Sequence, residues 1–214
     1  MRFILMMVFG LSVLTTSGCL AMGNSLKPSY GIVVVYGVVA NSTEKYGVEA
    51  IANDGRRLFG SASLPALEKS TDSGTLSYGG AGVPQWVQVS WREPIRGQQV
   101  ATSGKVFETL DFGKKLGDYR VEVAGRIPKE VFKYASEGRG RAIRLIFRIK
   151  DNGVLFAWGV QQNVRAPNGA TGRVYSLFGG DLSCDDVGGV ISKERCTSGY
   201  LKDAPWYNSL WTFW

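Results

Sequence analysis

Apolar and polar positions alternate most regularly in the segment from Ala142 to Lys150. The odd-numbered positions are all apolar: Ile143, Leu145, Phe147 and Ile149. The even-numbered positions after Ala142 are mainly basic: Arg144, Ile146, Arg148 and Lys150. A period of two residues predicts a β-strand. Asp151-Asn152-Gly153 follows directly and predicts a hairpin turn, with residues 154–160 as the returning strand.

Other segments have strand character of a less regular kind. Residues 30–40 are rich in β-branched side chains and predict a buried strand. Residues 46–52 and 57–62 flank Asn53-Asp54-Gly55, which predicts a second hairpin. Shorter strands are expected in three further places, at residues 86–91, 119–123 and 175–178. The polar, glycine-rich stretch 67–82 is interpreted as an exposed loop.

Residues 128–137 are the best candidate for a helix. Pro128 suits the first helical turn, Glu130 favours the positive end of the helix dipole, and Gly138 can end the helix. The pattern as a whole predicts a mainly β fold, an antiparallel sandwich or a strongly curved sheet with one short helix. Residues 30–214 are expected to form a single domain.

The N-terminal segment predicts export. Arg2 precedes an almost unbroken apolar run, residues 3–14, which is too short to span a membrane and is typical of a secretory signal peptide. The following Thr16-Ser17-Gly18-Cys19 resembles the lipobox of bacterial lipoproteins, although that box usually opens with leucine. Residues 1–18 are therefore interpreted as the signal peptide, Cys19 as the acylated residue and residues 19–29 as a lipidated tether. Ordinary cleavage after Ala21, without lipid, is the alternative.

The lipoprotein interpretation also predicts a location. In the lipoprotein sorting rule, Leu20 in place of an aspartate after the cysteine implies export to the outer membrane, with the domain facing the periplasm. Several acyl chains anchor a protein firmly without any spanning helix. Removal of residues 1–18 takes away Arg2 and no acid, so the formal net charge of +7 falls to +6. This modest charge suits anionic lipid headgroups or an acidic protein, and nucleic acid is a poor fit for an exported chain.

Composition excludes much enzyme chemistry. The chain has no histidine, so it cannot hold a Ser-His-Asp triad, a Cys-His pair or a histidine-ligated zinc. The carboxylates that lie closest together in sequence are interpreted as a solvated acidic loop, with a carboxylate-based hydrolase as the alternative: Asp181, Asp185, Asp186 and Glu194. No catalytic residue, metal or cofactor is predicted.

Trp86, Trp91 and Trp158 are assigned to the core. A spacing of five residues places Trp86 and Trp91 on opposite faces of their strand.

Three further groups of residues are candidates for bonding or binding. Cys184 and Cys196 are expected to form a structural disulfide in an exported protein. The basic residues around the regular strand form either a solvated face or a contact for an acidic partner or lipid phosphates: Arg139, Arg141, Arg144, Arg148 and Lys150. The aromatic tail either docks on the core or contacts a partner or a membrane: Trp206, Tyr207, Trp211, Phe213 and Trp214.

The order of several short motifs resembles a known family. Pro84-x-Trp86-Val87-x-Val89-x-Trp91 is followed by Ile127-Pro128-x-x-Val131 and then by Gly153-Val154-Leu155-Phe156-x-Trp158. This order, over roughly residues 30–160, resembles the bacterial lipoproteins that carry domain of unknown function 2931. The resemblance implies a periplasmic lipoprotein without established enzymatic activity. It further implies an immunity protein that neutralises a type VI secretion phospholipase effector. A structural, envelope-assembly or lipid-binding lipoprotein is the alternative.

Overall fold

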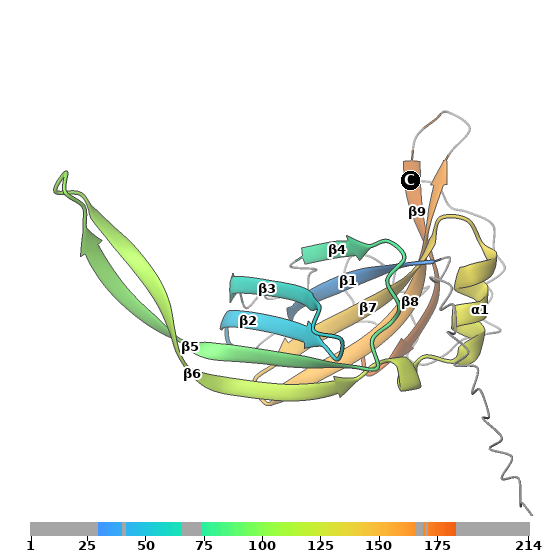
Figure 1. The fold of residues 1–214 in the computed structure, drawn as a ribbon, viewed down its shortest axis with the longest axis horizontal. Coiled ribbons are helices and arrows are strands. Elements are labelled where there is room, and N and C mark those ends of the chain that lie inside the picture. Colours follow the sequence, from blue (N-terminus) through green and yellow to red (C-terminus); the bar gives the residue numbers. More distant parts are fainter. Residues whose placement is uncertain (1–29, 40–41, 66–73, 166–168, 170, 183–214) are drawn as a thin grey trace, which may run out of the picture.

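In the described part of the chain, the regular structure consists of two β-sheets, one short α-helix and one turn of 3₁₀ helix (Figure 1). The computed structural model describes residues 30–39, 42–65, 74–165, 169 and 171–182. One sheet has five strands and the other has four, and their inner faces pack together over one hydrophobic core. The predicted mainly β class with one short helix is confirmed.

The five-stranded sheet is mixed, not purely antiparallel as predicted. Its order is β4 (Gly74–Tyr78), β1 (Gly31–Val38), β7 (Arg141–Lys150), β8 (Gly153–Arg165) and β9 (Thr171–Gly180). β1 and β7 run parallel, from Gly31 beside Ala142 to Val38 beside Ile149, whereas the other neighbours are antiparallel. Parallel neighbours need a long crossover connection, and here the whole four-stranded sheet lies between β1 and β7 in sequence.

The four-stranded sheet is antiparallel throughout. Its order is β3 (Arg57–Leu64), β2 (Lys45–Ala52), β5 (Trp86–Val100) and β6 (Val106–Glu122). The hairpin predicted around Asn53-Asp54-Gly55 is confirmed as β2 and β3. β5 and β6 are 15 and 17 residues long and extend well beyond the segments predicted for them, 86–91 and 119–123.

Side chains alternate between the two faces of each strand, and those on the inner faces of the two sheets form the core. Phe147 of β7 lies between Phe59 of β3 and Phe156 of β8, with ring centroids 5.6 and 5.3 Å apart. All three rings are fully buried, which stabilises the fold by roughly 1.5–3 kcal/mol for each side chain. These contacts join residues from both sheets, so the aromatic cluster fixes how the sheets face each other.

The five-stranded sheet is also buried on its second face. Val33 and Val35 of β1, Ile146 of β7 and Ala157 of β8 form a separate buried cluster with Leu182. The centre of this sheet is therefore buried on both sides, which is typical of a sheet that is covered on both faces.

The predicted helix is confirmed as α1 (Lys129–Glu137). Pro128 occupies the position before its first turn, and Gly138 ends it. Val131 and Ala135 are its buried residues and join the core, while a short 3₁₀ helix, η1 (Ala124–Arg126), connects β6 to this segment. In the described part of the chain, no helix is long and apolar enough to cross a membrane.

The segment predicted as a loop, residues 67–82, contains a strand. β4 lies within it and pairs with β1 from Ile32 beside Tyr78 to Tyr36 beside Gly74. The prediction was wrong here because five residues that begin with glycine carry little strand signal, and the pairing with a distant strand decides the conformation.

Candidate functional site

A two-stranded arm projects from the body of the protein (Figure 1). β2 pairs with β5 only as far as Arg92, which lies beside Tyr46, and β5 then continues to Val100 with β6 as its only neighbour in the described sheet. The turn is closed by hydrogen bonds from the Ala101 amide to the Lys105 carbonyl and from the Gly104 amide to the Ala101 carbonyl, both 2.8 Å long. We call residues 93–116 the arm.

The arm carries all of the exposed large apolar side chains in the described part of the chain. Their exposed fractions range from 39% for Phe112 to 70% for Val100. The set is Ile95, Val100, Val106, Phe107, Phe112 and Leu116. Single exposed apolar residues are ordinary, but six confined to one element make the arm a candidate interaction site.

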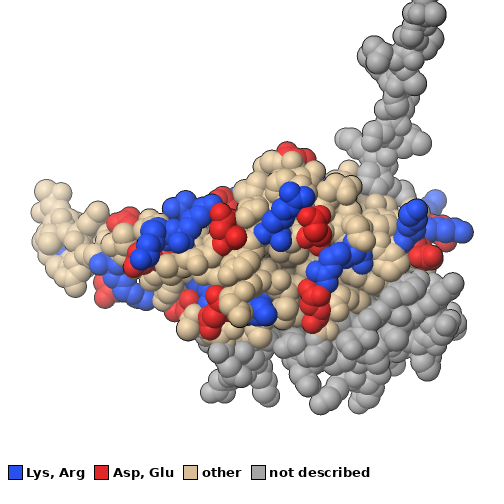
Figure 2. Space-filling view, turned by 90° about the horizontal axis from the view of Figure 1, so that it is seen from below, with Lys and Arg blue, Asp and Glu red and all other residues tan. Residues whose placement is uncertain are grey.

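The outer face of the four-stranded sheet is polar by contrast. Arg120 pairs with Glu122 at 2.8 Å and lies 4.5 Å from the centroid of the Trp86 ring, and the Gln88 side-chain amide donates to Asp118 at 2.6 Å. Figure 2 shows Lys and Arg interspersed with Asp and Glu over the body, whereas the arm at the left is mainly uncharged at its end. The apolar exposure of the arm is therefore not a general property of this surface.

Tight packing around Trp91 fixes the arm to the body. The Trp91 side chain is buried, stacks on Tyr119 at 5.3 Å and lies directly over Gly117, where a Cβ atom would come within 2.2 Å of the indole. Gly47 has a φ of +53°, and a Cβ atom there would lie 2.9 Å from the Phe112 ring. Both glycines are required by these close approaches.

The predicted arrangement of the tryptophans is confirmed in part. Trp91 and Trp158 are buried in the core. Trp86 is only half-buried on the opposite face of β5, which agrees with the expectation that Trp86 and Trp91 point to opposite sides and not with a place for Trp86 in the core.

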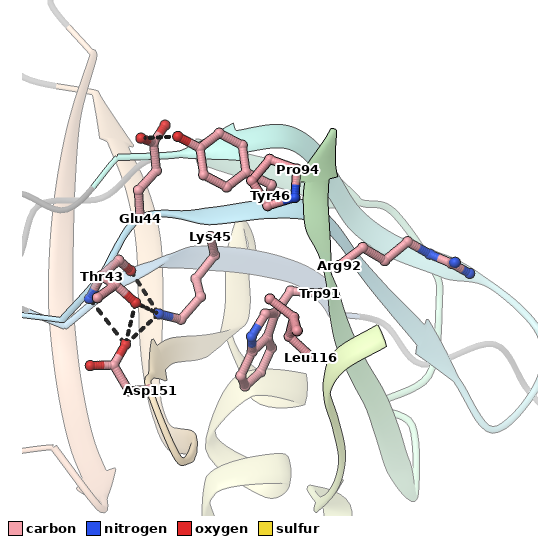
Figure 3. A pocket seen from close by; sticks show the side chains of 9 residues that line it. All are labelled: Thr43, Glu44, Lys45, Tyr46, Trp91, Arg92, Pro94, Leu116 and Asp151. Carbon is pink, nitrogen blue, oxygen red and sulfur yellow. Dashed lines mark hydrogen bonds and ion pairs between the residues drawn. The ribbon is translucent and has the colours of Figure 1, made fainter. Parts of the chain in front are cut away.

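A cavity of about 270 Å³ lies at the base of the arm (Figure 3). It is lined by the start of β2 and the two residues before it, by β5 and β6, and by the turn after β7: Thr43, Glu44, Lys45, Tyr46, Trp91, Arg92, Pro94, Leu116 and Asp151. The Tyr46 hydroxyl donates to Glu44, and this hydrogen bond raises the pKa of Tyr46. Arg96 of the arm donates to the same hydroxyl at 3.0 Å. Pro94 and Leu116 of the arm form part of the cavity lining.

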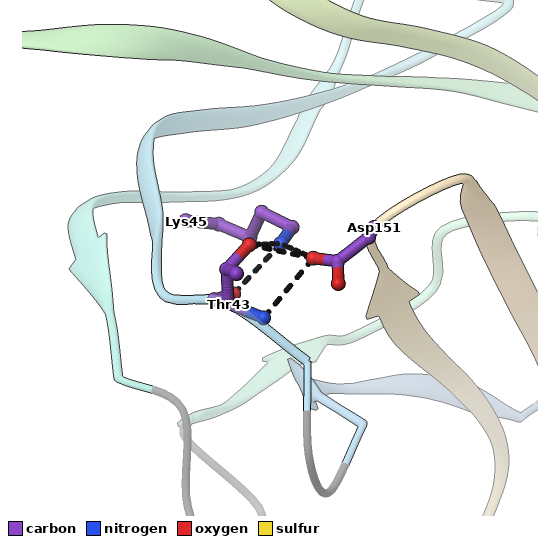
Figure 4. A network of polar contacts seen from close by, with 3 residues as sticks. All are labelled: Thr43, Lys45 and Asp151. Atoms are coloured by element: carbon purple, nitrogen blue, oxygen red, sulfur yellow. Dashed lines mark hydrogen bonds and ion pairs between the residues drawn. The ribbon is translucent and has the colours of Figure 1, made fainter.

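Lys45 and Asp151 join the two sheets beside this cavity (Figure 4). The Lys45 side chain is 3% exposed, and its Nζ donates to Asp151 Oδ1 at 2.6 Å and to the carbonyl and hydroxyl oxygens of Thr43 at 2.7 Å. The Thr43 amide and hydroxyl also donate to Asp151 Oδ1. The hydrogen bonds from Lys45 and then Thr43 lower the pKa of Asp151 to about 2. These bonds satisfy a buried cation and hold β2 against the β7–β8 turn.

The basic residues of β7 do not form the solvated face that their alternation suggests. Arg144 and Arg148 are 3% and 0% exposed, so the expectation of a solvated stripe is wrong for both. Their face of the strand also carries Ile146 and belongs to the second buried face of the five-stranded sheet. Arg141 donates to the Tyr134 carbonyl of α1 at 2.7 Å, and Lys150 is half-buried at the end of the strand. Partner binding by these four residues stays a prediction.

Several predicted residues lie outside the described part of the chain. They are the signal peptide 1–18, Cys19, the tether, Cys184, Cys196, Trp206, Tyr207, Trp211 and Trp214, together with Asp185, Asp186 and Glu194. Acylation, the disulfide and the binding role of the tail therefore stay predictions.

Asp181 is the one member of the predicted acidic group that the structure describes. Burial raises the pKa of its carboxyl, but hydrogen bonds from the Arg126 guanidinium and the Phe156 amide outweigh this effect, and the pKa is lowered. Asp181 thus ties η1 to β8. Across residues 30–182, as far as the structure describes them, no group of three or more acidic or cysteine side chains is placed to hold a metal ion.

The exposed residues of the arm were not predicted from the sequence. The available signal was Val100 and Val106 on either side of Ser103-Gly104, a turn dipeptide between two β-branched residues. Glycine and proline interrupt the alternation on both sides of this turn, at Pro94, Gly97 and Gly113, and conceal two strands of exceptional length.

Comparison of the chain with models of known protein families, with curated proteins and with solved structures gave no match.

Proposed function

We propose that this protein is a non-enzymatic, lipid-anchored protein of the periplasmic face of the outer membrane, and that it binds another protein through the arm. The observation that carries the proposal is that all exposed large apolar side chains of the described residues lie on this one element. Aromatic and apolar side chains that a partner desolvates supply most of the binding energy at protein interfaces. The cavity beside Trp91 and Pro94 adds a recess for an anchoring side chain.

The position of Tyr30 supports an orientation in which the arm points away from the membrane. Tyr30 precedes β1 and lies 6.3 Å from Phe132 of α1, measured between ring centroids, at the end of the body opposite to the arm (Figure 1). If Cys19 carries the lipid, the chain enters the fold at this end. The arm then points away from the anchored end, towards molecules in the periplasm.

The most specific version of the proposal is an immunity protein that blocks a type VI secretion phospholipase effector. It rests on the family resemblance together with the projecting apolar arm. Deletion of the gene is expected to make cells sensitive to attack by sister cells that carry the effector, and a plasmid copy is expected to restore protection. Full resistance of the deletion strain would overturn the immunity version and leave the binding proposal standing.

Affinity capture with variants of the full chain tests the binding proposal. Val106 and Phe107 are 59% and 52% exposed, so Val106→Ser combined with Phe107→Ser is expected to leave the fold intact. Loss of two such anchors is expected to reduce recovery of the partner from solubilised envelopes at least about tenfold. Lys129→Ser with Lys133→Ser, on the exposed face of α1, is the matched control.

Each outcome of this capture decides between proposals. A protein retained by the control and lost with the arm variant supports binding through the arm. Recovery of envelope-assembly proteins in this way favours the structural alternative over immunity. Equal recovery of every protein by the arm variant and the wild type would contradict a role for the arm.

A further inference from the structure

The apolar residues of the arm lie on both of its faces. Directly opposed residues of antiparallel strands share a face, so the strand register assigns each side chain. One face carries Pro94 beside Phe112, Arg96 beside Leu110, Gln98 beside Glu108, and Val100 beside Val106. The other face carries Ile95 beside Asp111, Gly97 beside Thr109, and Gln99 beside Phe107. Phe112, Val100 and Val106 are therefore exposed on one side, and Ile95 and Phe107 on the other.

We propose that the arm inserts into a cleft of its partner protein, whose two walls contact the two faces of the arm. This inference rests on the proposed function and specifies the shape and chemistry of the partner. A flat partner surface covers one face only and leaves either Phe107 or Phe112 in water. A cleft covers both faces, and the outer part of the arm is a two-stranded ribbon with nothing else from the described chain beside it.

The spacing along the arm gives the depth of the cleft. Phe112 near the base lies six positions along the strand from Val106 at the tip, which corresponds to about 20 Å of extended strand. Glu108 lies between these residues on the same face, and Asp111 lies beside Ile95 on the opposite face. A complementary cleft therefore has apolar walls, with basic side chains that face Glu108 on one wall and Asp111, nearer the mouth, on the other, because buried carboxylates need cationic partners.

The acidic residues disfavour insertion of the arm into a lipid bilayer. An arm inserted as far as Phe112 would carry Glu108 and Asp111 into the hydrocarbon region, where ionised side chains are costly. Insertion of the tip alone would leave Ile95, Phe112 and Leu116 without a partner. A second copy of this chain is disfavoured as well, since a two-fold contact sets the same patch against itself and covers one face.

Site-specific photo-cross-linking in living cells tests the inference. Three variants of the full chain each carry one benzoylphenylalanine. It replaces Phe112 on one face of the arm, Phe107 on the other face, or Lys133 on α1 as the control position. We expect both arm positions to cross-link to the same protein, with the linked peptides on opposite walls of one cleft, and Lys133 to give no such product.

Other outcomes overturn the inference in distinguishable ways. Cross-links from only one face would show a flat contact and would overturn the cleft, while the arm would remain the binding element. A lipid adduct or a product with a second copy would replace the cleft by a bilayer or a dimer. The absence of any cross-link from either arm position would overturn the proposed function as well.

A charge reversal provides an independent measurement. Glu108→Lys is expected to reduce the cross-link yield from Phe107 at least about tenfold, because two cations would then meet inside the cleft. Glu108→Gln is expected to have a clearly smaller effect, and Lys114→Glu near the base of the arm is the matched control. An unchanged yield with Glu108→Lys would overturn the basic character of the cleft.

Discussion

Lys45 and Asp151, beside the arm, are a single pair of residues that contributes to the stability of the fold. The ammonium group is buried and depends on three oxygen atoms, two from Thr43 and one from Asp151. The sequence offered no sign of this pair, because Asp151 belongs to a turn signal and Lys45 lies 106 residues earlier, just before the predicted strand 46–52. Lys45 belongs to one sheet and Asp151 to a turn of the other, so only the packing of the two sheets brings these two residues together.

Asp151→Asn is expected to destabilise the protein by about 1–3 kcal/mol at neutral pH, because the buried Lys45 loses its countercharge. The pKa of Asp151 is about 2 in the folded protein against an ordinary value of 3.8. Protonation therefore favours the unfolded chain, and the contribution of Asp151 to stability is lost as pH falls from about 5 towards 2. Urea unfolding at several pH values should show the difference between wild type and variant shrinking over this range.

The double variant Lys45→Met with Asp151→Asn is the control for this pair. It removes both charges, so it should cost less stability than Asp151→Asn alone. Equal stability of wild type and Asp151→Asn at neutral pH would contradict the account of the pair.

At the scale of elements, sequence and structure agree where the signal is local. The turns at residues 53–55 and 151–153 and the helix that begins after Pro128 follow from a few adjacent residues, and all three were predicted. β7 was predicted as a strand, but its arginine face was not predicted to be buried. Ile146, between Arg144 and Arg148 on that face, was the one indication. The parallel pairing of β1 with β7 has no local signal at all.

The base of the arm depends on Gly117 as the place where Trp91 packs. A methyl group at residue 117 would overlap the indole, so Gly117→Ala is expected to displace Trp91 and to reduce the free energy of unfolding by about 1–3 kcal/mol. Gly125→Ala is the matched control, since beyond its own turn and chain neighbours nothing lies within 4 Å of the added methyl group. Chemical unfolding of both variants measures the effect, and equal stabilities would show that this contact does not fix the arm.

At the scale of the whole molecule, the protein has two ends of different character. α1 and Tyr30 lie at one end of the double-sheet body, and the arm extends from the other (Figure 1). The outer face of the body carries the Arg120–Glu122 ion pair of β6, while the arm leaves large apolar side chains in water. The sequence predicted the body from alternation and turns, but it could not predict the arm, because an exposed ribbon lacks the half-buried pattern by which strands are recognised.

Amide hydrogen exchange tests most directly whether the arm is the binding element. Exchange is measured for the chain alone and for the complex recovered with it from the cell envelope. We predict that slowing of exchange on binding is concentrated in residues 93–116 and in the strands around the cavity at the base of the arm, while α1 is unchanged. Protection confined to α1 or to the body, with the arm amides exchanging as in the free chain, would contradict the account.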